Sequence, residues 1–216
     1  PELRARGWTE AMVHHFLGEP DHRVVNPYYR TAAQMRLYRV ARVLAAEESQ
    51  EFVARAAKAA TRSARGKAIA EQKAQALLEQ VAAMPVSVRS LAPEVLQRSA
   101  IANYNDRQRR RALERLEYVE PASATSDAAF LERITVNYVR HRLTAYDRRL
   151  EAVAGRIGVA RAIALIRQRV YAAIAEAYPH LAQECARQLA RRVGDEPGDA
   201  ARSVEIGFQR GSECAV

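Results

Sequence analysis

The feature that most restricts the fold of this chain is the segment from residue 47 to residue 84, which contains no proline and a single glycine, Gly66. Alanine, arginine, glutamate, glutamine and lysine make up most of it, and these unbranched side chains lose little rotamer freedom in a helix. Pro85 follows, and proline cannot continue a helix because it lacks a backbone N–H. The segment therefore predicts one long helix, either continuous or broken at Gly66. Aromatic residues form only 6% of the chain, so we expect a mainly α fold.

A short helix is predicted near the start of the chain. Thr9 is a good N-cap, and apolar side chains follow with helical spacing at Val13, Phe16 and Leu17. Gly18 then ends the helix. This segment predicts the first helix of a small N-terminal module.

The next residues predict an extended segment, a turn and a second helix. Val24-Val25 is strand-like, and Asn26-Pro27 is typical of a turn. The stretch 35–38 either begins the second helix or is extended and leads into it. The apolar residues that continue to Leu44 indicate a helix.

Four segments of this module carry a resemblance, namely Trp8-Thr9-Glu10-Ala11, the stretch from Phe16 to Asp21, Asn26-Pro27-Tyr28-Tyr29 and the stretch from Met35 to Val43. Their pattern resembles the small winged-helix fold of MerR-type regulators and phage excisionases. It is also similar to the DNA-binding core of the xeroderma-pigmentosum group A damage-recognition family. The chain lacks the zinc-binding cysteines of that family and the dimerisation coiled coil of MerR proteins. The resemblance therefore implies a winged-helix-like fold and a DNA-binding role, but neither damage recognition nor effector sensing.

Arginines and tyrosines gather in the same module. If residues 35–42 are helical, Arg36, Arg39 and Arg42 lie near one face; if the first part is extended, Arg36 shares a face with Tyr38. Guanidinium groups bind phosphate oxygens in bidentate fashion, and tyrosine donates to phosphate or stacks on a base. The alternative is that Tyr38 belongs to the core and the arginines form a solvated face. The candidate nucleic-acid-binding residues here are Tyr28, Tyr29, Arg30, Arg36, Tyr38, Arg39 and Arg42.

The predicted long helix adds a second group of cations. Their steps of three and four residues place most of them along one helical stripe, which would match several phosphates of a nucleic-acid backbone. A solubilising helix face is the alternative. These residues are Arg55, Lys58, Arg62, Arg65 and Lys67. A further basic cluster, residues 107–115, either extends this surface or solvates its own helix.

The second half of the chain predicts three further helices, at about 93–116, 127–153 and 158–192, with a kink or break at Tyr178-Pro179-His180. Residues 121–126 are small, polar and proline-led, as domain linkers are. The predicted organisation is a winged-helix-like nucleic-acid-binding module at 1–48, a long basic helix with connecting helices at 49–120, a C-terminal helical domain at 121–193 and a flexible tail at 194–216.

A search for catalytic chemistry leaves one polar helix face, formed by Asn137, His141 and Thr144. It suits acid–base chemistry or, as we favour, a polar network between helices, because no nucleophile–base pair, paired carboxylates or phosphate-binding glycine loop accompanies it. His14 and His15 are adjacent and point about 100° apart on a helix, so they cannot chelate one ion. We therefore expect no enzyme activity, no metal site and no cofactor.

Net charge completes the functional prediction. The formal charge is +9, which attracts polyanions. No apolar run approaches the roughly 20 residues of a membrane span, and no secretory leader is evident, so we expect a cytoplasmic protein, nucleoid-associated if it binds DNA. We predict a nucleic-acid-binding protein, with DNA favoured over RNA by the resemblance alone. The alternative is a helical scaffold of phage or antitoxin type that forms homo-oligomers or binds a protein partner through its C-terminal helices.

Overall fold

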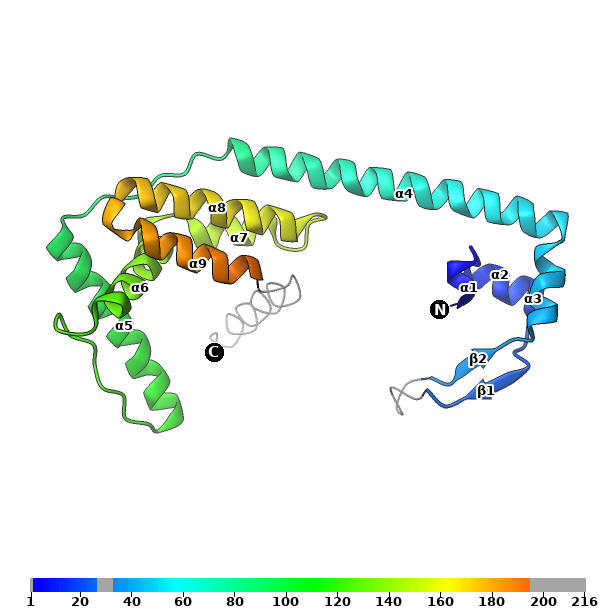
Figure 1. The fold of residues 1–216 in the computed structure, drawn as a ribbon, viewed down its shortest axis with the longest axis horizontal. Helices are drawn as coiled ribbons and strands as arrows, with labels where there is room; N and C mark the ends of the chain where they lie inside the picture. The colour runs from blue at the N-terminus through cyan, green and yellow to red at the C-terminus, as the bar shows by residue number, and fades with distance from the viewer. Residues whose placement is uncertain (1, 27–32, 195–216) are drawn as a thin grey trace, which may run out of the picture. The chain divides into compact units, whose positions relative to one another are not determined.

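The computed structural model describes residues 2–26 and 33–194 of the chain. Helices dominate these ranges, as predicted, and two three-residue strands accompany them (Figure 1). The elements are α1 Glu2–Ala5, α2 Glu10–Met12, π-helix Val13–Leu17, β1 His22–Val24, β2 Met35–Leu37, α3 Val40–Glu47, α4 Gln50–Ala83, α5 Pro93–Arg115, α6 Ala128–Tyr138, π-helix Val139–Leu143, α7 Tyr146–Val153, α8 Val159–Ala177, 3-10 helix Pro179–Leu181 and α9 Ala182–Gly194.

The N-terminal module contains the two predicted helices, and the extended segment between them is a two-stranded hairpin of β1 and β2. Thr9 caps α2, because its hydroxyl accepts a hydrogen bond from the Met12 amide at 3.2 Å. Residues 35–37 are a strand, so the extended alternative is correct and the helical one is wrong; Arg39 is the N-cap of α3. Pro27, in the predicted turn, lies outside the described residues.

The long helix exists, but it is α4 and begins at Gln50 rather than at residue 47. Ser49 explains the difference: its hydroxyl accepts from the Phe52 amide at 3.2 Å and donates to the Ala46 carbonyl at 2.7 Å. The residue thus closes α3 and caps α4. At Gly66 the helix continues without a break, since the roughly 1 kcal/mol cost of one glycine is small against the favourable residues around it.

The chain divides into two compact units, Pro1–Ala70 and Glu71–Val216. This division falls inside α4 and differs from the predicted boundaries after residues 48 and 120. The first turns of α4 belong to the N-terminal unit because Phe52 is buried in its core. Residues 121–126 do not separate two units, since the Asn105 side chain accepts from the Ala122 amide at 2.8 Å and donates to its carbonyl at 2.9 Å.

The core of the second unit unites the end of α4 with α6, α7, α8 and α9. Leu77 and Val81 of α4 are almost fully buried there, together with Val170 and Ile174 of α8. Helices α8 and α9 lie side by side (Figure 1). At the α7–α8 turn, Gly158 has a φ of +84°, and a Cβ atom there would lie 2.6 Å from the Cβ of Ala74. Only glycine satisfies both the backbone and this close approach.

Residues 84–92, which join α4 to α5, form no regular secondary structure but are hydrogen-bonded to Tyr178 and Leu143. The Tyr178 hydroxyl accepts from the Leu91 amide at 2.9 Å and donates to the Arg89 carbonyl at 3.1 Å. The Arg89 amide donates to the Leu143 carbonyl at 2.9 Å. These bonds satisfy backbone groups that no regular element pairs.

The C-terminal helices follow most of the sequence signals. Pro93 opens α5 and α8 ends before Pro179, as predicted. Asp127 caps α6 by accepting from the Phe130 amide at 2.8 Å. The single helix predicted at 127–153 is wrong, because the chain is extended at Thr144 and restarts as α7. Of the predicted tail 194–216, residues 195–216 lie outside the described residues.

In the described part of the chain, no helix combines the length and apolarity that crossing a bilayer requires. Cys185 is a buried free thiol. Its burial, with a smaller contribution from Glu184, raises the pKa to about 11.

Candidate nucleic-acid interface

The N-terminal unit is built on an aromatic core. Trp8, Phe16 and Phe52 meet with ring centroids 4.5–6.2 Å apart, and Leu17 and Val43 are buried with them. Residues from the π-helix Val13–Leu17, α3 and α4 therefore share one core. It fixes the surface from which the predicted cations project.

The hairpin places two arginines directly opposite each other. Strands β1 and β2 are antiparallel, with Arg23 facing Arg36 across the pair. Like charges in this position repel, and each is balanced by a carboxylate: Arg23 by Glu19 and Arg36 by Glu10, both at 3.0 Å. Arg23 was not among the predicted residues. Its position beside the strand-like Val24-Val25 is the signal that would have found it.

Arg39 and Arg42 converge on Asp21. The Arg39 backbone N–H donates to Asp21 Oδ2 at 2.8 Å, and Arg42 Nη1 lies 2.9 Å from Asp21 Oδ1. The Arg39 hydrogen bond is the main reason that the pKa of Asp21 is lowered; burial opposes this effect, and the Arg42 hydrogen bond and the charges of both arginines reinforce it. Arg42 also donates to the Leu17 carbonyl. Arg42 is thus committed to holding the module together, whereas the Arg39 side chain is 75% exposed.

At the start of α4, Arg55 is also paired. Its Nη2 lies 2.9 Å from Glu51 Oε1, and its guanidinium lies 5.8 Å from the centroid of the Phe16 ring. His15 Nε2 lies 3.0 Å from the same carboxylate oxygen. Hydrogen bonds from His15 and then Arg55 lower the pKa of Glu51 despite some burial.

The remaining cations of α4 differ from all of these. Lys58, Arg62, Arg65 and Lys67 are exposed, and within residues 2–26 and 33–194 none of them has an acidic partner. At about 100° per residue, Lys58, Arg62 and Arg65 fall within a narrow stripe, while Lys67 lies on the opposite face of the helix. Every residue from 60 to 69 is exposed, so this part of α4 packs against nothing that the structure describes.

Tyr38 is half-buried against the aromatic core, and its hydroxyl donates to the Gly18 carbonyl at 3.4 Å. Together with Arg36 it lines a cavity of about 700 Å³ that Arg4 and Arg6 also line. Tyr28, Tyr29 and Arg30, which the sequence also nominated, lie outside the described residues.

The predicted polar face of the second unit is a network, with a different membership. Thr144 stands at the break between helices, where its hydroxyl donates to the Arg140 carbonyl and accepts from the Tyr146 amide. Buried Arg140 takes the central place: it donates to Asn137 Oδ1 at 3.0 Å, to the Tyr171 hydroxyl and to His141 Nε2. The burial of Arg140 could not be read from the sequence, because it depends on packing against Tyr171 of α8.

His141 Nδ1 lies 2.8 Å from Asp147 Oδ1. Burial acts to raise the pKa of Asp147, but the His141 hydrogen bond and the charges of His141, Arg140 and Arg142 lower it overall. Across the described ranges, no group of three or more histidines, cysteines and carboxylates could hold a metal ion.

Comparison of the chain with protein-family models, with curated proteins and with solved structures finds no match. The winged-helix assignment of the N-terminal module therefore stays a prediction. Function has to be argued from the distribution of charge and contacts.

Proposed function

We propose that the protein binds nucleic acid, and DNA in particular, through contacts between the basic side chains of α4 and the phosphate backbone. The observation that carries this proposal is the stripe of Lys58, Arg62 and Arg65, which are exposed and lack acidic partners among the described residues. Residues 52–70 contain five lysines and arginines and no acidic residue. From Lys58 to Arg65 the stripe spans about 10 Å of helix, which matches the spacing of several backbone phosphates.

The paired arginines of the hairpin and α3 add positive charge to the same unit. Residues 1–70 hold 12 lysines and arginines against 7 aspartates and glutamates. Arg36 and Arg39 are 53% and 75% exposed, and exposed ion pairs contribute only about 0–1 kcal/mol. Phosphate groups can therefore displace Glu10 from Arg36 at little cost, and they can bind the exposed Arg39 side chain while Asp21 keeps its bonds to the Arg39 backbone and Arg42. The choice of DNA over RNA rests on the resemblance of residues 8–43 to DNA-binding modules.

The test is a fluorescence-anisotropy titration of the full chain with duplex DNA, single-stranded DNA and RNA at several salt concentrations. Each phosphate contact contributes about 0.9 to the log–log salt slope on duplex DNA. The variant Lys58→Gln/Arg62→Gln/Arg65→Gln is expected to weaken binding and to reduce the slope by up to about 3 units.

The control variant is Arg98→Gln/Arg109→Gln/Arg115→Gln, which removes the same charge from exposed positions of α5. Its salt slope should change little. Equal effects of the two variants would show that net charge, rather than α4, governs binding, and an absence of binding near physiological salt would refute the proposal.

A second function, docking of a protein partner, is favoured by the end of α5. Leu113, Leu116 and Tyr118 are 70%, 95% and 89% exposed and line a cavity of about 400 Å³. Apolar groups this exposed are typical of interaction surfaces. Sedimentation analysis separates the two functions, because association through an apolar interface persists at high salt, whereas phosphate binding weakens.

A further inference from the structure

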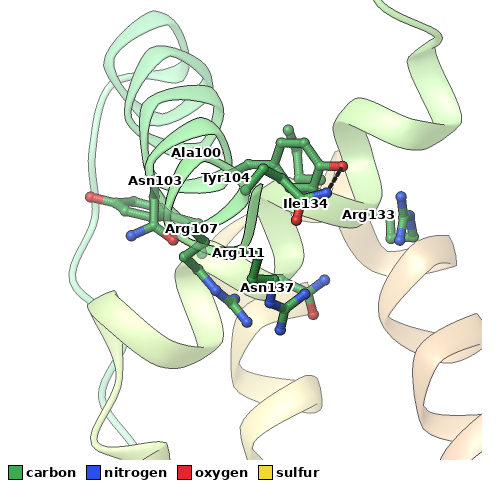
Figure 2. A pocket seen from close by; sticks show the side chains of 10 residues that line it. Ala100, Asn103, Tyr104, Arg107, Arg111, Arg133, Ile134 and Asn137 are labelled. Carbon is green, nitrogen blue, oxygen red and sulfur yellow. Dashed lines mark hydrogen bonds between the residues drawn. The ribbon is translucent and has the colours of Figure 1, made fainter. Parts of the chain in front are cut away.

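A second basic site, unrelated to α4, lies between α5 and α6 in the C-terminal unit (Figure 2). The two helices pack against each other. Ala100 and Ile134, which are 1% and 4% exposed, line the pocket together with polar side chains from both helices. Its volume is about 230 Å³. This is smaller than the roughly 300–1,000 Å³ of pockets that enclose drug-sized ligands.

Three arginines line this pocket. Arg107 and Arg111 are one turn apart on α5, and Arg133 belongs to α6 (Figure 2). None of the ten lining residues is acidic, and over the described ranges none of the three arginines has a carboxylate partner. Their neighbour Arg110, by contrast, lies 2.7 Å from Asp106. The pocket therefore gathers three guanidinium groups that no carboxylate of the described residues neutralises.

Neutral donors complete the lining. Because a guanidinium group only donates, the bond from Arg140 fixes Oδ1 of Asn137 toward Arg140. The Nδ2 group of Asn137 is left without a protein acceptor in the part of the chain that the structure describes, and so is the amide of Asn103. Gln108 donates to the Tyr104 hydroxyl at 2.9 Å, which leaves that hydroxyl proton free to donate.

Behind Asn137 lies a buried positive charge. Arg140 is 4% exposed, and its partners are Asn137, His141 and Tyr171 rather than a carboxylate. Burial lowers the pKa of Arg140, as expected for a cation removed from water. A guanidinium group still keeps its proton at neutral pH, so Arg140 adds to the positive potential at the pocket.

We propose that this pocket binds a phosphate monoester. The guanidinium groups of Arg107 and Arg111 and two amide donors match the terminal oxygens and the double negative charge of that group, and Arg133 adds positive charge at the pocket. The volume accommodates the phosphate and a few adjoining atoms, while the rest of the ligand lies outside. The same chemistry comes from two sources, a free nucleotide or the 5′-phosphate end of a nucleic-acid strand.

Isothermal titration calorimetry of the full chain tests the proposal with adenosine 5′-monophosphate, adenosine and inorganic phosphate. The nucleotide should bind and adenosine should not. Arg107→Gln/Arg111→Gln should weaken binding by on the order of tenfold or more, since it removes two charge-assisted contacts. Arg109→Gln/Arg115→Gln removes the same charge from α5 outside the pocket and should change affinity less than about twofold.

The second arm compares 5′-phosphorylated and 5′-hydroxyl oligonucleotides in the Lys58→Gln/Arg62→Gln/Arg65→Gln background, which removes the α4 stripe. If the protein prefers the phosphorylated strand and Arg107→Gln/Arg111→Gln abolishes this preference, the phosphate is that of a strand end. Binding of the free nucleotide alone assigns it to small molecules. Failure of every phosphorylated probe to bind, or equal loss in the α5 control, overturns the proposal and leaves the α4 interface untouched.

Discussion

The contact between Glu47 and the N-terminal residues gives the sharpest stability prediction. Glu47, the last residue of α3, accepts hydrogen bonds from Arg6 Nε at 2.9 Å and from Trp8 Nε1 at 2.7 Å. Its side chain is 19% exposed. The Arg6 hydrogen bond, followed by that of Trp8, lowers the pKa of Glu47 from 4.5 to about 2, against an opposing effect of burial. The carboxylate thus ties residues 6–8, which join α1 to α2, to the end of α3.

The sign and size of its contribution follow from this pKa. Because the folded pKa lies below the unfolded one, the stabilisation is fully present above about pH 5 and is lost as the pH falls toward 2. At about 1.4 kcal/mol per pKa unit the shift sets an upper limit of about 3 kcal/mol. Arg6 is 48% exposed, so solvent weakens the pair and we expect about 2 kcal/mol. Glu47→Gln should destabilise the N-terminal unit by this amount at pH 7.

Urea denaturation followed by tryptophan fluorescence measures this effect in the full chain. Trp8 is the single tryptophan and is 3% exposed in the core of residues 1–70, so its signal reports that unit. Glu48→Gln is the matched control, because Glu48 is the exposed neighbour. The difference between wild type and Glu47→Gln should narrow from pH 5 to pH 2. Equal stability of the two variants, or a difference independent of pH, would refute the reasoning.

Two further predictions concern the C-terminal unit. Gly158→Ala should lower the free energy of unfolding by about 2 kcal/mol or more, because the new Cβ meets Ala74 at 2.6 Å and the φ of +84° suits only glycine. Thermal denaturation followed by circular dichroism measures this loss. Gly66→Ala, where a Cβ meets nothing within 4 Å, is the control and should instead be stabilising. Asp127→Ala removes the carboxylate that caps α6, whose Oδ1 accepts a hydrogen bond from the Phe130 amide. This substitution should lower the free energy of unfolding by about 1 kcal/mol in the same assay. No change in the melting transition would contradict this capping role.

Local signals were sufficient to predict most helix ends. Thr9 and Asp127 cap their helices through bonds to residues three positions along the chain, and Pro93 and Pro179 act through their own missing N–H. Such interactions lie within one helical turn, so the residues nearby contain all the information needed. Ser49 is a local signal that composition concealed. Its capping role is local too, but it was hidden inside a segment whose composition is helical throughout.

Contacts between distant residues decided which arginines are available. From the sequence alone, Arg36, Arg42 and Arg62 look alike, yet the first pairs with Glu10, the second is bonded to Asp21 and Leu17, and the third is exposed without an acidic partner among the described residues. Those partners lie some 20 residues away in the chain, and no spacing rule reaches so far.

The same reason explains the second unit. Arginine is seldom buried, and the burial of Arg140 follows from its contact with Tyr171, far along the chain in α8. The break at Thr144 likewise accompanies the packing of α7 against α8. The sequence by itself determined a mainly helical, basic chain with one long helix, because backbone preferences act locally. Only the tertiary structure decided which charges are neutralised, which are buried and which remain exposed without an acidic partner among the described residues.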